Sequence, residues 1–249
     1  MRAQRRWLLV LIPLILIVVV TIGGLVWVSN PAAPMPEALA ALESDSAVAV
    51  SRDRGWIVLR PASAPQTGLI FYPGGLVSPE AYTTPLREIA ASGYLVVIVP
   101  MPLNLAVFDS AAAAGVIAAY PDITRWAIAG HSLGGSMAAR FAFDNPDMVR
   151  GLALWAAYPE ADRDMSGRDL AAASIDGSLD GLATVEQVEG ARPLLPPDTA
   201  WVKIEGGNHA QFGSYGDQAR DNAATISRAD QQAQVVAAML DLLARVEAE

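Results

Sequence analysis

Ser132 lies in the pattern Gly130-x-Ser132-x-Gly134, after an apolar run and before an alanine-rich stretch. A serine in this pattern can occupy a sharp turn from a strand into a helix, where its hydroxyl is presented as a nucleophile. We expect glycine at both flanking positions because side chains there would collide where the strand and the helix cross. The first amides of the helix would favour a developing oxyanion. The alternative is a glycine-rich turn capped by Ser132, but the flanking strand and helix favour the nucleophile.

A serine hydroxyl needs a base to attack at neutral pH, and the chain has only two histidines. His131 adjoins Ser132, and we expect it to point away from the hydroxyl because neighbouring side chains on a sharp turn diverge. His209 lies just past the last expected strand, in a loop that begins at Glu205. The alternative for His209 is an exposed loop residue. Because no other base is available, we predict that His209 activates Ser132.

A third residue should orient the histidine, and two aspartates lie in the right part of the chain. Asp176 directly ends an expected strand at 171–175, and we expect it to be a turn residue. Asp180 lies about one turn further along, in a glycine-containing loop. We predict that Asp180 is the partner of His209, within hydrogen-bond reach of roughly 2.6–3.2 Å.

Backbone amides must bind the oxyanion that forms when a serine attacks a carbonyl. The N–H of Leu133, directly after the nucleophile, is expected to be the first donor. The second should come from the loop Pro73-Gly74-Gly75-Leu76, since glycine lets backbone N–H groups approach a ligand closely. Either Gly75 or Leu76 is the donor, with Gly75 preferred; the alternative is an ordinary turn.

The composition excludes several other chemistries. The chain has no cysteine, which excludes a thiol nucleophile, disulfides and thiolate metal sites. Two histidines are too few for a three-histidine zinc site or an HExxH motif, and no nucleotide-binding glycine motif is present. We therefore expect no metal and no cofactor. The net charge of −9 becomes more negative without the first thirty residues, so we expect no nucleic-acid partner.

Strands and helices are expected to alternate along the chain. Strands are expected at 47–51, 56–60, 69–72, 94–99, 126–129, 152–155, 171–175 and 201–204. Helices are expected at 79–92, 110–120, 132–144 and 229–247. The alternation predicts an α/β fold with a mostly parallel, doubly wound sheet and helices on both faces. Ligands of such sheets bind outside the carboxyl ends of the strands, where Ser132 and His209 are expected.

From about Thr67 to Leu243 the chain resembles the α/β-hydrolase fold family, in particular bacterial serine hydrolases related to dienelactone hydrolases. The resemblance is carried by Tyr72-Pro73-Gly74-Gly75, Gly130-His131-Ser132-Leu133-Gly134-Gly135, Gly177-Ser178-Leu179-Asp180-Gly181 and Gly207-Asn208-His209-Ala210-Gln211-Phe212. It implies an ester-type hydrolase with Ser132, Asp180 and His209 as a triad, in the family's chain order, and no cofactor. Two departures stand out. Many relatives have His-Gly where this chain has Pro73-Gly74, and dienelactone hydrolases themselves use cysteine as nucleophile.

The connection between two expected strands limits the substrate. Only about fourteen residues separate Trp155 from Leu170, so we expect a minimal lid. The residues expected to line an acyl pocket, with core packing as the alternative, are Leu103, Leu105, Phe108, Tyr158 and Phe212. These features predict cleavage of carboxylic esters with small or short acyl groups. The same triad would serve a thioesterase, a lactonase or an acyltransferase, and a non-catalytic binding protein is the rival of another class.

The N-terminal segment predicts attachment to a lipid bilayer. Trp7 to Val28 carries no charge, and a helix of this length would span roughly 33 Å. A cleaved signal peptide and a buried core helix are the alternatives. Arginines precede the segment and acidic residues follow it, which predicts a cytoplasmic N-terminus and a catalytic domain outside. The expected organisation is an anchor at 1–30, a proline-containing linker at 31–45 and a catalytic domain at 46–249. The sequence makes no prediction about oligomeric state.

Overall fold

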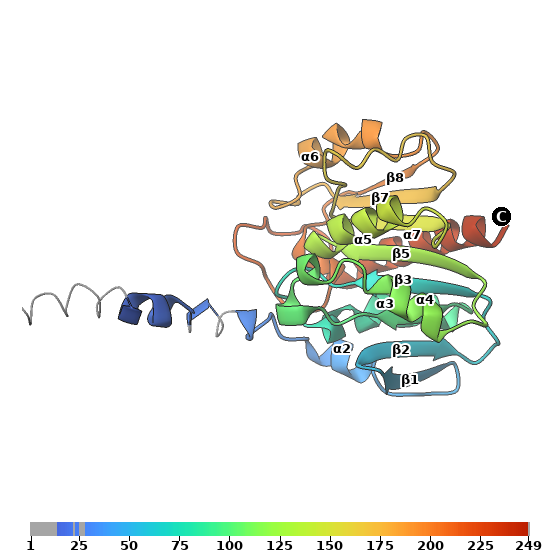
Figure 1. Ribbon diagram of the computed structural model, residues 1–249, viewed down its shortest axis with the longest axis horizontal. Helices are drawn as coiled ribbons and strands as arrows, with labels where there is room; N and C mark the ends of the chain where they lie inside the picture. The colour runs from blue at the N-terminus through green and yellow to red at the C-terminus, as the bar shows by residue number, and fades with distance from the viewer. Residues whose placement is uncertain (1–13, 22, 25–27, 249) are drawn as a thin grey trace, which may run out of the picture. The chain divides into compact units, whose positions relative to one another are not determined.

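The computed structural model describes residues 14–21, 23–24 and 28–248, and the chain divides into two units, Met1–Pro31 and Ala32–Glu249. The second unit is built on one sheet of eight strands in the order β1-β2-β4-β3-β5-β6-β7-β8 (Figure 1). The strands are β1 (Val48–Asp53), β2 (Trp56–Pro61), β3 (Thr67–Tyr72), β4 (Leu95–Ile98), β5 (Arg125–His131), β6 (Gly151–Trp155), β7 (Ala171–Gly177) and β8 (Ala200–Ile204). β1 and β2 pair antiparallel with their neighbours, and the strands from β4 to β8 are all parallel. The predicted mostly parallel sheet is confirmed.

Helices cover both faces of this sheet (Figure 1). The principal helices are α3 (Thr83–Ala91), α4 (Ala113–Ala119), α5 (Leu133–Asp144) and α7 (Arg228–Ala248), with the short α2 (Pro36–Ala40) and α6 (Val185–Gly190). Buried side chains of α3 and α7 share one core with alternate residues of the strands, and those of α4 and α5 share a second core with the others. The central strands are therefore buried on both sides, which explains their continuous apolar sequences.

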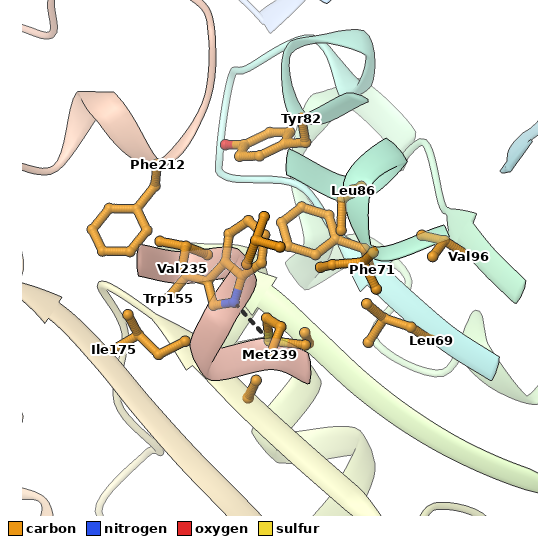
Figure 2. Packing of buried hydrophobic residues seen from close by; sticks show 14 of the residues in the cluster. Leu69, Phe71, Tyr82, Leu86, Val96, Trp155, Ile175, Phe212, Val235 and Met239 are labelled. Atoms are coloured by element: carbon orange, nitrogen blue, oxygen red, sulfur yellow. Dashed lines mark hydrogen bonds between the residues drawn. The ribbon is translucent and has the colours of Figure 1, made fainter. Parts of the chain in front are cut away.

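The core beneath the site joins β3, β6 and α7. Phe71 and Trp155 pack with their ring centroids 4.7 Å apart, and the Trp155 indole N–H donates to Met239 Sδ at 3.2 Å (Figure 2). Phe71 lies two residues before Pro73, and Trp155 pairs in register with His131 at the end of β5. This packing therefore fixes the carboxyl ends of the strands that carry the chemistry.

Two connections bear on the expected organisation. The segment 156–170 between β6 and β7 contains neither helix nor strand, as expected for a minimal lid. The segment expected as a linker, 31–45, packs on the second unit over part of its length. Ala32 bridges to Val77, and α2 buries Ala38 completely, so this part of the chain belongs to the catalytic unit. The Ala32 and Met35 N–H groups and the Ala38 and Ala41 carbonyls are hydrogen-bonded to the rest of the unit.

The expected anchor Trp7–Val28 lies partly outside the described residues, because 7–13, 22 and 25–27 are not described. Residues 14–21 and 23–24 are helical, and the large apolar side chains from Leu14 to Val20 are exposed. Within the described residues, no helix combines the length and the apolar character that a membrane crossing requires.

Candidate active site

Ser132 occupies the turn between β5 and α5. Its φ of 52° and ψ of −124° are strained for a residue with a side chain. A Cβ at Gly130 would lie 2.5 Å from the backbone of Gly134, and one at Gly134 would lie 2.2 Å from the Tyr72 carbonyl oxygen. Glycine is thus required at Gly130 by the crossing of β5 and α5, as predicted, and at Gly134 by the close approach of α5 to the end of β3.

Asp180 and His209 form a buried hydrogen bond. His209 Nδ1 lies 2.8 Å from Asp180 Oδ2, within the expected reach, and both residues are at most 5% exposed. The other carboxylate oxygen, Oδ1, accepts the N–H groups of Leu182 and Ala183 at 2.8 and 2.7 Å. These bonds fix the carboxylate plane. His209 Nε2 is buried and has no hydrogen-bond partner among the described residues.

His131 lies beside His209, with ring centroids 4.5 Å apart. The side chain is turned toward Tyr82, whose hydroxyl is 2.9 Å from His131 Nδ1. Burial, together with the neighbouring His209, holds the pKa of His131 well below its usual value, so the ring is neutral. The ring of His131, the residue before Ser132, therefore packs against the ring of His209.

The loop after β3 offers one free amide. The Gly74 N–H donates to the Tyr82 hydroxyl at 3.0 Å, and the Leu76 N–H donates to the Asn104 carbonyl at 2.8 Å. Within the described part of the chain, no hydrogen bond is made by the N–H groups of Gly75 or Leu133. Of the two residues considered for the second oxyanion donor, Gly75 therefore has the available N–H.

Asp176 is not a turn residue, contrary to the expectation. β7 continues to Gly177, and Asp176 pairs in register with Lys203 of β8. Its carboxyl is only 4% exposed, and its Oδ2 atom has no hydrogen-bond partner among the described residues. Burial raises the pKa of Asp176 to about 6 from 3.8, and Lys203 opposes that rise.

The residues expected to line an acyl pocket differ in their exposure. Leu103 and Phe108 are 44% and 59% exposed, while Leu105 is half-buried, with its Cδ2 atom 3.4 Å from the position of a Cβ at Gly75. Tyr158 is partly buried against the core. Phe212 is completely buried and stacks on His131 at 5.5 Å, so it supports the two histidines as part of the core.

The carboxylate of Asp221, which the sequence did not indicate, joins the loops that carry Asp180 and His209. Asp221 Oδ1 accepts the Gly181 N–H at 3.0 Å, and Asp221 Oδ2 accepts the Ala210 N–H at 2.9 Å. Gly181 follows Asp180, and Ala210 follows His209. No local pattern marks Asp221 or Tyr82, because their partners are distant in the chain.

In residues 14–21, 23–24 and 28–248, no group of three or more metal-ligating side chains could hold a metal ion.

Comparison with known proteins identifies the architecture. The model of the alpha/beta hydrolase family matches residues 68–233, well over half of the chain. A predicted CIB-like hydrolase from Thermoplasma acidophilum has a TM-score of 0.57 and 16% identity, over 78% of this chain and 99% of that one. TT1662 from Thermus thermophilus also has a TM-score of 0.57 and 16% identity, with 79% and 98% covered.

An alpha/beta hydrolase enzyme, MGS-MChE2, from the metagenome of lagoon sediments at Mar Chica, Morocco, has a TM-score of 0.53 and 15% identity, over 65% of this chain and 90% of that one. At such identities these structures establish the fold alone. A search of curated proteins finds no match. The family match over residues 68–233 and the eight-stranded sheet agree: the chain belongs to the alpha/beta hydrolase family, whose fold supports hydrolase activity.

Proposed function

We propose that this chain is a serine hydrolase that cleaves carboxylic esters, with Ser132 as nucleophile, His209 as base and Asp180 as the acid that orients the base. The observation that carries the proposal is the buried 2.8 Å hydrogen bond between His209 Nδ1 and Asp180. It holds the proton of His209 on Nδ1 and leaves Nε2 unprotonated, as a general base requires. The strained turn at Ser132 supports the role of its hydroxyl.

The proposed reaction uses these three residues in turn. His209 Nε2 takes the proton of Ser132 Oγ as the oxygen attacks the carbonyl carbon, and Asp180 stabilises the imidazolium that forms. The N–H groups of Leu133 and Gly75 stabilise the oxyanion, each by about 3–4 kcal/mol. Collapse of this intermediate breaks the ester bond, and His209 gives its proton to the leaving alcohol. A water activated by His209 then hydrolyses the acyl-enzyme.

The proposed substrates carry small or short acyl groups. The segment 156–170 has no helix that would cover the site as a large lid does, which supports an open site. Leu105, half-buried beside Gly75, is proposed to contact the acyl group, with Leu103 and Phe108 at the exposed margin of the same loop. Short esters should therefore be cleaved faster than long-chain triglycerides, without activation at a lipid interface.

The test compares variants on a panel of aryl esters of increasing acyl length. Ser132→Ala should abolish hydrolysis with nearly unchanged thermal stability. Asp180→Asn should lower kcat by roughly 10⁴-fold because the histidine loses its tautomer. If Ser132→Ala retained most of the activity, the proposed mechanism would be wrong. Turnover of thioesters or lactones, or transfer to an added alcohol, would reassign the substrate while keeping the same three residues.

We also propose that the enzyme is held at a membrane by residues 7–28, with its N-terminus cytoplasmic and its catalytic unit outside. The support is the 22-residue stretch without charge and the three arginines that precede it, Arg2, Arg5 and Arg6.

A further inference from the structure

Tyr82 connects the loop after β3 to the residue before the nucleophile. Its hydroxyl accepts the Gly74 N–H at 3.0 Å and lies 2.9 Å from His131 Nδ1. Tyr82 is completely buried and His131 is 1% exposed, so water does not compete for these bonds. Figure 2 shows the Tyr82 ring near Phe71 and Leu86, with the hydroxyl at the end of the ring away from Leu86. The ring centroids of Phe71 and Tyr82 are 4.9 Å apart, which restrains the tyrosine.

The direction of the hydrogen bonds follows from proton counting. The Tyr82 oxygen accepts from Gly74, which leaves its single proton to be donated, and His131 Nδ1 is the acceptor in reach. Burial raises the pKa of Tyr82 and lowers the pKa of His131, so the tyrosine stays protonated and the histidine neutral. We therefore assign to His131 the tautomer that accepts on Nδ1 and carries its proton on Nε2, an atom that is buried and has no hydrogen-bond partner among the described residues.

These bonds restrain Gly74, the residue before Gly75, whose own N–H is free. Gly74 is fixed by Tyr82 at its N–H and by the Val77 N–H at its carbonyl, at 3.3 Å, while Leu76 is fixed by Asn104. The Gly75 N–H lies between these fixed points. A Cβ at Gly74 would lie 2.7 Å from both His131 Nδ1 and Tyr82 Oη, so the loop backbone sits directly against the pair.

We propose that Tyr82 and His131 are positioning residues that hold Gly74 and thereby aim the Gly75 N–H at the oxyanion. This inference rests on the proposed function, because it assigns a role in the same reaction. It gives His131 a role distinct from that of a base. The histidine supplies a buried acceptor that stays neutral beside His209, so it does not oppose the positive charge that His209 gains during attack.

The test uses four variants of the full-length chain in detergent. Tyr82→Phe removes the hydroxyl, His131→Leu removes the acceptor, and His131→Asn keeps an acceptor near the position of Nδ1. The control is Tyr94→Phe, which removes the hydroxyl of another tyrosine, one that makes a partly buried bond to Glu247 at 3.3 Å. Each variant is measured for kcat and KM on a short ester, for affinity to a boronic acid that mimics the tetrahedral intermediate, and for thermal unfolding.

Tyr82→Phe and His131→Leu should lower kcat roughly ten- to a hundredfold with little change in KM, because a displaced oxyanion donor weakens the transition state and not the ground state. Affinity for the boronic acid should fall by a similar factor. His131→Asn should recover a large part of what His131→Leu loses, and Tyr94→Phe should match the unmutated enzyme.

Three outcomes would overturn the inference. These are an unchanged kcat in Tyr82→Phe, equal losses in His131→Asn and His131→Leu, and losses of kcat that merely follow the loss of folded protein. Failure of the proposed function is read separately, from the unmutated enzyme. If a fluorophosphonate does not label Ser132 there, the hydrolase mechanism falls and the inference falls with it.

Discussion

The strained conformation of Ser132 is held by the residues around it. A positive φ costs a residue with a side chain on the order of 1–3 kcal/mol and persists only where its surroundings determine it. The Ser132 N–H donates to the Trp155 carbonyl at 2.9 Å, which extends the pairing of β5 with β6 up to the turn. Because Trp155 is itself completely buried, the core that stabilises the fold also holds the serine in place.

Asp176 makes the free energy of unfolding depend on pH, in the direction opposite to that of most carboxylates. Its pKa is raised to about 6 in the folded chain, so the folded state holds the proton to a higher pH than the unfolded state does. Ionisation therefore destabilises the fold as pH rises from about 4 to about 6. Asp176→Asn should raise the free energy of unfolding by about 1–3 kcal/mol at about pH 8, and by little at about pH 4.

Urea unfolding of both proteins at the two pH values measures this difference. Asp122→Asn is the matched control, because Asp122 is exposed and should change little at either pH. An equal effect of Asp176→Asn at both pH values would show that the unpaired carboxylate is not the cause.

Individual residues were predictable where the constraint on them is local. Gly130 and Gly134 mark the turn at Ser132, and the position of His209 after the last strand marks it as the candidate base. Asp176 was placed wrongly because its apolar neighbours in the strand end at Ile175, whereas pairing with β8 continues to Gly177. Tyr82 could not be predicted, since its partner His131 is 49 residues away.

At the scale of elements, the acid and base belong to loops that follow different strands. Asp180 follows β7 and His209 follows β8, and these parallel strands are neighbours in the sheet. Their loops are further joined by the carboxylate of Asp221, from the polar segment before α7. A carboxylate can accept from both loops at once because it has two oxygens that accept and none that must donate.

Asp221→Asn should therefore weaken the alignment of Asp180 and His209. The amide group of asparagine replaces one accepting oxygen by a donor, which faces a backbone N–H and breaks one of the two bonds. We expect a loss of about 1–3 kcal/mol in stability and a fall in kcat of roughly tenfold with a smaller change in KM. Asp217→Asn is the control, because Asp217 is exposed on the same segment. Equal kinetics of the two variants would remove Asp221 from the active-site assembly.

The elements themselves were largely predictable from periodicity. All eight strands and the four longer helices lie where apolar runs and helical spacing placed them, because burial on both faces of a parallel sheet leaves a strong pattern. The short helix α2 was missed, since three prolines between Asn30 and Pro36 suggested an extended linker. Its helix is stabilised by distant contacts, such as the Thr83 hydroxyl on the Ala38 carbonyl, which no local pattern reveals.

At the scale of the whole molecule, the connection between the two units is short. Only Ser29, Asn30 and Pro31 separate Val28, the end of the proposed anchor, from Ala32. Ala32 donates its N–H to the Leu76 carbonyl at 2.8 Å and accepts the Ser78 N–H at 3.0 Å. The first paired residue of the catalytic unit is therefore attached to the loop that carries the proposed oxyanion donor.

Two truncations test the anchor and this attachment together. Removing residues 1–30 should release the enzyme from the membrane fraction with its activity intact, since Ala32 and α2 remain. Removing residues 1–45 should also release it, but the loop at Leu76 loses its partner, and Arg87 loses the carbonyls of Ala41 and Glu43, bound at 2.9 and 2.7 Å. Each such lost bond costs about 1 kcal/mol or more, so unfolding temperature and kcat should both fall.

Membrane release without any truncation, or a mature N-terminus near Ala32 by mass spectrometry, would indicate a cleaved signal peptide. Equal stability of the two truncated chains would return residues 32–45 to the role of a linker.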